Sequence, residues 1–353
     1  MALRTYESWL LLSFALAIGC QGNASKPSTT GAAGAGAAEV GAGGGAGGAG
    51  GTSGGAGGST SGGAGGAGGS PAGSGGGAGR EGGAPDGEDG GGASADTGAP
   101  GGPIKVLLFN HTAGYGHQSR LTAIPLLMAA AAANNIDLDL RYAHTTMPGK
   151  APLPEGTNDS ATPPDLSAFT PGGLDGYDVV FFLNTTGNVF QGADEAVHQQ
   201  ALQDFIDQHH GGFVGAHSAA DTYDDSWPWY QDMIGSIYSG HSNVVAGTVR
   251  KNPGVTSVIL SEAMVPDPWQ RMEEWYTFGR DVRQLTGFTA LLLANAPLPT
   301  GGVGERPSAW LHEVPGGGRV FYTGFGHFVA AFQEEAVMRL LMAGVKWAAH
   351  RTD

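Results

Sequence analysis

The stretch YDVVFFLN, residues 177–184, decides the fold class. From Val179 to Leu183 it is an unbroken apolar run, rich in β-branched and aromatic residues, that stops at Asn184. Such runs are typical of strands buried on both faces of a sheet. Two similar runs lie on either side of it in the sequence, IKVLLFN at 104–110 and GGFVGAH at 211–217. We therefore expect a sheet with these three strands at its centre.

Helical patterns alternate with these runs. Further strands are expected at 136–143, 289–295 and 319–325, and a long Pro- and Gly-rich loop at 144–173. Helices are expected at 120–134, with Ser119 as N-cap, and at 193–210 and 334–350. Alternating strands and helices predict an α/β fold, with a mainly parallel sheet and helices on both faces.

In such sheets, functional sites form beyond the carboxyl ends of the strands. Four sequence stretches occupy such positions and carry polar groups. They are TAGYGH (112–117), NTTGN (184–188), GAHSAAD (215–221) and GFGH (324–327). His241 and the run Glu273-Glu274-Trp275-Tyr276 add further candidates.

Histidines and carboxylates at converging strand ends indicate either a metal site or an acid–base site. The candidate metal ligands are His217, His241 and His327, and a divalent metal is a possible cofactor. The motifs HExxH and HxH do not occur, so the sequence leaves the metal open. Tryptophans and tyrosines such as Trp229, Tyr276 and Trp310 have two interpretations, stacking on a sugar ring or packing in the core.

The first 20 residues resemble a lipoprotein signal peptide. Arg4 provides a positive charge, the apolar run from Trp9 to Ile18 is too short to span a bilayer, and Gly19-Cys20 follows at once. Cys20, the chain's only cysteine, would then be lipidated and become the first mature residue. Ala17 departs from the usual lipobox leucine, and an ordinary signal peptide with an incidental cysteine is the alternative.

Lipidation would place the domain in the cell envelope, outside the cytoplasm, held to a membrane through the anchor only. Gln21, where an aspartate would favour inner-membrane retention in proteobacteria, favours the outer membrane. Residues 21–103 are dominated by Gly, Ala and Ser and lack the large apolar residues that could offset ordering entropy. We expect a disordered tether there, either a functional spacer or a tolerated insertion.

The remaining residues, 104–353, suit one domain of about 250 residues. The whole chain has a net charge of −15. Three of its 17 basic and seven of its 32 acidic residues precede residue 104, which leaves −11 for the rest. This acidic balance argues against nucleic-acid binding.

Taken in order, TAGYGH, YDVVFFLNTTG, GGFVGAHSAADT, WPWY, EEWYTF, AWLHEVPGGGRVFYTGFGH and KWAAH resemble the ThuA-like (trehalose utilisation) family. The resemblance covers residues 104–350 and implies a flavodoxin-like fold similar to the class I glutamine amidotransferases. Those enzymes carry a nucleophilic cysteine at a turn that here reads Gly215-Ala216-His217. Since the domain has no cysteine, thiolate-dependent glutamine hydrolysis is excluded. Ser218 lacks the GxSxG setting of a serine nucleophile.

The resemblance implies action on a small carbohydrate, either a sugar or a keto-sugar. We expect His217 and His327 to act as acid–base or metal-binding groups, with Asp221 orienting His217 and Glu274 completing the catalytic set. The expected substrate-binding residues are Thr112, Tyr115, His117, Asn184, Thr185, His241, Trp229, Tyr276 and Trp310. A non-catalytic carbohydrate-binding or sensing module is the main alternative, and a degenerate domain that packs against a partner is a third. The oligomeric state is left open.

Overall fold

The computed structural model describes residues 101–141, 154–224 and 226–353. The expected signal peptide, the lipidation of Cys20 and nearly all of the Gly-rich segment lie outside these residues. Within them, no helix has both the length and the apolar character needed to cross a membrane.

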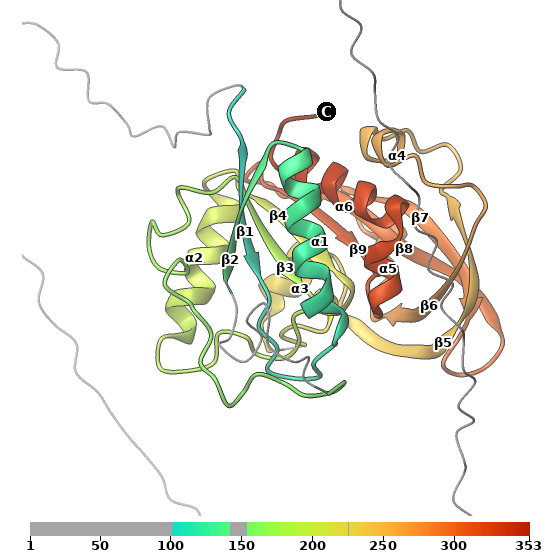
Figure 1. Cartoon of the computed structure of the whole chain (residues 1–353), viewed down its shortest axis with the longest axis horizontal. Coiled ribbons are helices and arrows are strands. Elements are labelled where there is room, and N and C mark those ends of the chain that lie inside the picture. The colour runs from blue at the N-terminus through green and yellow to red at the C-terminus, as the bar shows by residue number, and fades with distance from the viewer. Residues whose placement is uncertain (1–100, 142–153, 225) are drawn as a thin grey trace, which may run out of the picture. The chain divides into compact units, whose positions relative to one another are not determined.

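Nine strands form one sheet in the order β2-β1-β3-β4-β9-β8-β7-β5-β6 (Figure 1). Five of them are parallel, namely β1 (Ile104–Phe109), β2 (Ile136–Arg141), β3 (Val179–Leu183), β4 (Gly212–Ala216) and β9 (Arg319–Thr323). Their order matches the 2-1-3-4-5 order of flavodoxin-like sheets. The expected α/β fold with a flavodoxin-like parallel sheet is confirmed.

The sheet continues beyond β9 as four antiparallel strands. They are β8 (Val303–Glu313), β7 (Phe288–Pro297), β5 (Tyr238–Lys251) and β6 (Trp269–Phe278). Of these four strands, only β7 was expected, since it contains the strand predicted at residues 289–295. The sequence did not predict the antiparallel extension.

Helices cover both faces of the sheet. One face carries α1 (Ser119–Ala133), α4 (Val258–Ala263), α5 (Val329–Gln333) and α6 (Glu335–Ala348), and the other carries α2 (Glu195–Asp207) and α3 (Pro228–Ile234). The 3₁₀ helices η2 (His217–Ala220) and η3 (Val282–Gln284) complete the elements.

The central strands are buried on both sides, which explains their unbroken apolar runs. In β1, Val106 and Leu108 belong to the core beneath α1 and α6, whereas Leu107 and Phe109 belong to the core beneath α2 and α3. All four side chains are fully buried. Packing of these two cores against the two faces holds the sheet in place. It therefore also positions the edge at which the parallel strands end.

Three of the loops at that edge are joined by isolated bridges from Thr112 to Thr186 and from Thr186 to Asp221. The loop after β9 is held by Ser119, whose hydroxyl donates to Gly326 O over 2.7 Å. The expectation that Ser119 caps α1 is therefore wrong, because it is the first helical residue and its hydroxyl is used elsewhere.

Candidate functional site

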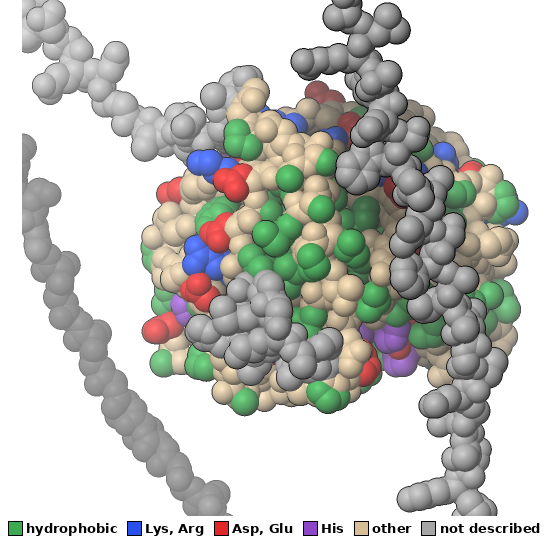
Figure 2. All heavy atoms as spheres, viewed as in Figure 1, with side chains coloured by type: hydrophobic (Ala, Val, Ile, Leu, Met, Phe, Trp, Pro, Cys, Tyr) green, Lys and Arg blue, Asp and Glu red, His purple; other side chains and the backbone are tan. Residues whose placement is uncertain are grey.

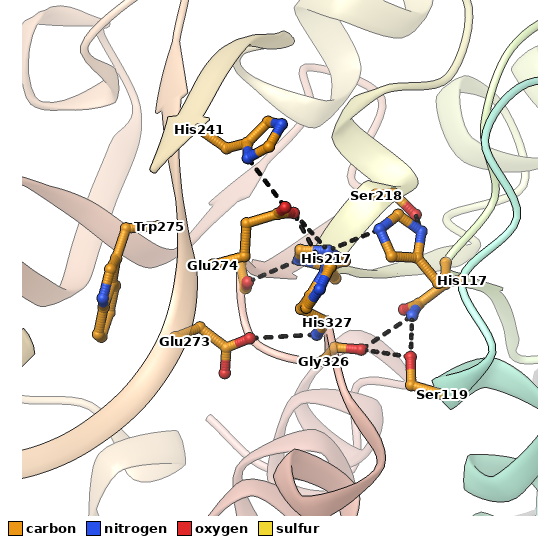
Figure 3. Close-up of polar contacts among 12 residues, drawn as sticks. His117, Ser119, His217, Ser218, His241, Glu273, Glu274, Trp275, Gly326 and His327 are labelled. Carbon is orange, nitrogen blue, oxygen red and sulfur yellow. Dashed lines mark hydrogen bonds and ion pairs between the residues drawn. The ribbon is translucent and has the colours of Figure 1, made fainter. Parts of the chain in front are cut away.

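Four side chains converge at the carboxyl edge of the parallel strands (Figure 3). His117 comes from the loop after β1, His217 begins η2 after β4, and His327 lies in the loop after β9. Glu274 reaches them from β6, in the antiparallel half. One ligand atom from each residue lies within 4.8 Å of all the others.

The distances within this group suit a small cation. His117 Nε2 lies 3.2 Å from His217 Nε2, and Glu274 Oε2 lies 3.5 Å from His217 Nε2 and 3.1 Å from His327 Nδ1. Ligands bound at about 2.0 Å in a tetrahedron are about 3.3 Å apart. The four residues, hereafter the His₃Glu cluster, are therefore spaced as a ligand set.

The opposite ring nitrogens of two histidines are occupied. His217 Nδ1 lies 3.1 Å from Gly324 O, and His117 Nδ1 lies 3.2 Å from Ser218 Oγ. Because a carbonyl oxygen only accepts, His217 Nδ1 must donate, and the contact fixes the ring so that Nε2 faces the cluster. Such outer contacts orient metal-binding histidines in proteins.

Electrostatics also favours cation binding. Burial, together with the nearby His217 and His327 rings, holds the pKa of His117 well below its ordinary value, so this ring is neutral. Burial would raise the pKa of Glu274, but hydrogen bonds with His217 and His327 hold it well below its usual range. A neutral imidazole and an ionised carboxylate are the forms that bind metals.

In the absence of a cation, Glu274 pairs with His327. Burial alone would lower the pKa of His327, but its hydrogen bond to Glu274 and the charges of Glu274 and Glu273 raise it. A bound cation would replace the proton on this ring, so metal binding at the cluster is expected to release protons.

His217 has an unusual backbone conformation. Its φ is +47°, in the left-handed region that β-carbon sterics make rare for residues other than glycine. Tyr322 Oη donates to the His217 carbonyl over 2.7 Å and helps to hold the turn. Strained residues of this kind cluster at functional sites. The turn is the one predicted at Gly215-Ala216-His217.

The metal-ligand prediction needs one correction. His241 was expected to be a ligand with His217 and His327, but its Nδ1 lies 2.9 Å from Glu274 Oε1 and its side chain is 42% exposed. It therefore supports Glu274 from outside the His₃Glu cluster. His117, expected to bind substrate, takes the place of His241 in the ligand set.

Asp221 does not orient His217. The described contacts of the His217 ring nitrogens are with His117, Gly324 and Glu274 instead. Asp221 ends η2, and burial, followed by the charges of Asp224 and Glu274, raises its pKa to about 7. Its carboxyl thus lies close enough to the site to respond to Glu274.

Three expected substrate-binding residues belong to the buried framework. Thr112, Asn184 and Thr185 are fully buried. Thr112 Oγ1 donates to Asp159, Thr185 Oγ1 bonds Thr222 Oγ1 at 2.8 Å, and Asn184 Nδ2 donates to Gly326 O at 2.9 Å. Their side chains hold the site loops together rather than facing a ligand.

Two expected tryptophans lie elsewhere. Trp310 is fully buried in the core, where its indole donates to Ile234 O. Trp229 donates to Asp207 at the end of α2, near the beginning of β4 and at the opposite edge of the sheet. The prediction that both bind substrate at this site is wrong, because an aromatic residue type does not reveal which edge it occupies.

Three tyrosines surround the cluster. Tyr276 packs its ring 4.3 Å from that of His217, and the 49%-exposed Tyr115 lies 5.0 Å from that of His117. Tyr238, on β5, lies 4.8 Å from Tyr276 and was not predicted. Sequence reasoning missed it because β5 was not recognised as a strand. In Figure 2, histidine and acidic side chains lie side by side at the surface.

The domain is similar to known proteins. The solved structure of a putative ThuA-like protein from Bacteroides uniformis ATCC 8492 has 18% identity and a TM-score of 0.51, covering 70% of this chain and 92% of that one. The glutaminase domain of Trypanosoma brucei CTPS, with bound acivicin, has 13% identity and a TM-score of 0.38, covering 71% and 95%. A comparison with curated proteins finds no match.

The family comparison covers nearly the whole described domain. The model of the ThuA family, described as trehalose utilisation, matches residues 105–348. These residues include all five parallel strands, apart from the first residue of β1, and every member of the His₃Glu cluster. The chain therefore belongs to the ThuA trehalose-utilisation family.

Proposed function

We propose that the domain is a metal-dependent enzyme that acts on a sugar or keto-sugar. The observation that supports this most is the convergence of three imidazole nitrogens and one carboxylate oxygen within 4.8 Å. Three nitrogen donors and one oxygen donor suit Zn²⁺ and similar divalent transition metals. Membership of the trehalose-utilisation family supports a carbohydrate as substrate.

The chain's own residues divide the work. His117, His217, His327 and Glu274 would hold the cation, which when bound would polarise a carbonyl or hydroxyl oxygen of the substrate. Tyr115 and His241 are the exposed neighbours of the cluster, so the substrate would enter between them. The substrate ring would pack against tyrosine, which offers an apolar face and a polar hydroxyl.

Asp221 is the proposed proton carrier. Its side chain is half-buried, and its pKa of about 7, raised by burial and by Asp224 and Glu274, lies near neutral pH. A general acid or base works best when its pKa is close to the working pH. The sequence left His217 and His327 as either acid–base or metal-binding groups. Both fit better as ligands, which leaves Asp221 to move the proton.

The charges around the cluster favour an uncharged substrate. The charges of Glu155 and Glu273 act on His327, and those of Asp224 and Glu274 act on Asp221. The charge of Glu274 would be offset by the bound cation, but the carboxylates outside the ligand set would repel an anionic substrate. We propose a neutral sugar rather than a phosphorylated one.

The test combines metal content with turnover. The protein is stripped with EDTA, reloaded with Zn²⁺, Mn²⁺ or Co²⁺, and assayed on a 3-keto-disaccharide and on the same disaccharide with one hydroxyl phosphorylated. One metal per chain should bind, and turnover of the neutral sugar should require it. His217→Ala and His327→Ala should lose both, whereas Trp229→Ala at the opposite edge should keep both.

Unchanged turnover in the two histidine variants would overturn the assignment. Sugar binding without any product, measured by calorimetry, would favour the carbohydrate-binding module instead.

We also propose that the domain is held at the cell envelope by a lipid on Cys20, outside the cytoplasm. The supporting observations are the apolar run from Trp9 to Ile18, the Gly19-Cys20 pair that follows it, and the absence of any other cysteine.

A further inference from the structure

Glu273 is a second carboxylate that reaches His327, next in sequence to Glu274. It is fully buried. Its Oε1 accepts the backbone N–H of His327 over 3.1 Å, whereas Glu274 contacts the ring of the same residue (Figure 3). Two neighbouring residues of β6 thus hold His327 at its backbone and at its side chain.

Arg271 holds Glu273 in turn. Its Nη2 donates to Glu273 Oε2 over 2.8 Å, and its Nη1 donates to Glu334 Oε2 over 3.0 Å. The guanidinium lies over two aromatic rings that pack edge to face against each other, 4.5 Å from the centroid of Trp269 and 4.2 Å from that of Phe325. Two carboxylates and two ring faces fix one planar group, which lysine could not reproduce.

The peptide group between Gly326 and His327 is fixed at both of its polar atoms. Its carbonyl oxygen accepts from Ser119 Oγ at 2.7 Å and from Asn184 Nδ2 at 2.9 Å. Its N–H donates to Glu273. The plane of this peptide therefore cannot rotate without breaking three hydrogen bonds, two of them buried, and its orientation determines where the His327 side chain starts.

The loop itself would not hold this orientation. Gly326 has a φ of +130°, a conformation that other residues rarely adopt, and His327 belongs to no helix or strand. Hydrogen bonds from α1 and from Asn184, just after β3, on one side and from β6 on the other therefore supply the rigidity.

We propose that Glu273, held by Arg271, is a positioning residue that sets the metal affinity and ligand geometry of the cluster through the backbone of His327. This inference rests on the proposed metal site. Loss of an outer contact to a metal ligand typically weakens affinity 10–100-fold. Neither residue belongs to the His₃Glu cluster, and the contact that links Glu273 to a member of it is the hydrogen bond to the His327 backbone.

The main experiment is a Co²⁺ titration of the full chain, with affinity measured by chelator competition and ligand geometry by the visible d–d spectrum. Glu273→Ala should bind Co²⁺ about 10–100-fold more weakly and show an altered spectrum. Glu273→Gln keeps an oxygen that can accept the His327 N–H and should restore most of both. Glu335→Ala, which removes an exposed carboxylate paired with Arg339, is the matched control and should change neither.

A second readout does not need metal. Hydrogen exchange of the metal-free protein should be faster in Glu273→Ala for the peptide that contains His327, and unchanged in Glu273→Gln.

If the wild type binds Co²⁺ but Glu273→Ala keeps its affinity, its spectrum and its slow exchange, the positioning role is overturned and the proposed function stands. If the wild type binds no metal, the proposed function fails, while exchange still decides whether Glu273 holds the loop. Should Glu273→Ala not fold, Arg271→Lys takes its place in both measurements.

Discussion

At the scale of single residues, the site depends on how neighbours shift protonation. His117 is kept neutral and Glu274 ionised, the forms that bind metals, whereas His327, whose pKa is raised, would give up its proton to a cation. The sequence placed histidines and Glu274 near one another, because strand ends and paired carboxylates are visible in it. It could not assign roles, since Asp221 and His241 differ from the members of the His₃Glu cluster only by the directions of their side chains.

Asp221→Asn tests whether the pKa of Asp221 is raised in the folded protein. The pKa of Asp221 is raised to about 7 by burial, Asp224 and Glu274. Between pH 4 and 7 the folded state therefore binds this proton more strongly than the unfolded state, and the contribution of Asp221 to stability falls as pH rises. The variant should be more stable than wild type at pH 8 by about 1–2 kcal/mol, less than the full shift implies because the carboxyl is partly exposed.

The measurement is denaturant unfolding at pH 4 and pH 8 in EDTA, with Asp224→Asn as a control of lesser effect. Equal stability differences at the two pH values would show that Asp221 titrates normally.

At the scale of elements, the parallel half of the sheet could be predicted and the antiparallel half could not. Strands buried on both faces are continuous apolar runs, as in Val179–Leu183. In contrast, β5 is YSGHSNVVAGTVRK, in which exposed and buried residues are mixed and the register with β6 shifts twice. Because of these irregularities, the apolar residues of β5 do not alternate with the period of two that would identify a strand. Tyr238 and the role of Glu273 were missed because they lie on these strands.

Substitution of Arg306 tests how the strands of the antiparallel half are held together. This buried residue of β8 donates to the backbone carbonyls of Tyr276 on β6 and of Ala296 and Pro297 on β7, although β6 and β8 are not neighbours in the sheet. Arg306→Leu would leave these buried acceptors without donors and should lower the free energy of unfolding by about 2–4 kcal/mol.

Arg306→Lys should recover only part of that loss, since an ammonium cannot match the five donors of the guanidinium. Arg283→Leu, which removes an arginine with a 36%-exposed side chain, should change stability by about 0.5 kcal/mol or less in the same unfolding measurement. A small loss in Arg306→Leu would show that Arg306 does not hold these strands together.

At the scale of the whole molecule, chemistry and attachment are assigned to separate parts of the chain. Every member of the His₃Glu cluster lies within residues 105–348, the segment that the family model matches. The proposed lipid site at Cys20 precedes that segment by more than 80 residues of mostly Gly, Ala and Ser. Changing the attachment should therefore leave the site intact.

Cys20→Ser tests that separation. When the full chain is expressed in a bacterial host with lipoprotein processing, the wild type should fractionate with membranes and incorporate labelled palmitate. The variant should lose the label and appear in the soluble fraction, with unchanged Zn²⁺ stoichiometry and turnover. Membrane association that persists without palmitate would contradict the anchor.

The source of the four ligands has one more consequence. Three histidines come from loops of the flavodoxin-like half, and the single carboxylate comes from β6, the edge strand of the extension. The extension thus supplies the only negative charge in the ligand set. A protein engineer who trimmed this domain to its five parallel strands would keep three imidazoles and lose their counter-ion. The proposed chemistry would therefore require both the parallel and the antiparallel half of the sheet.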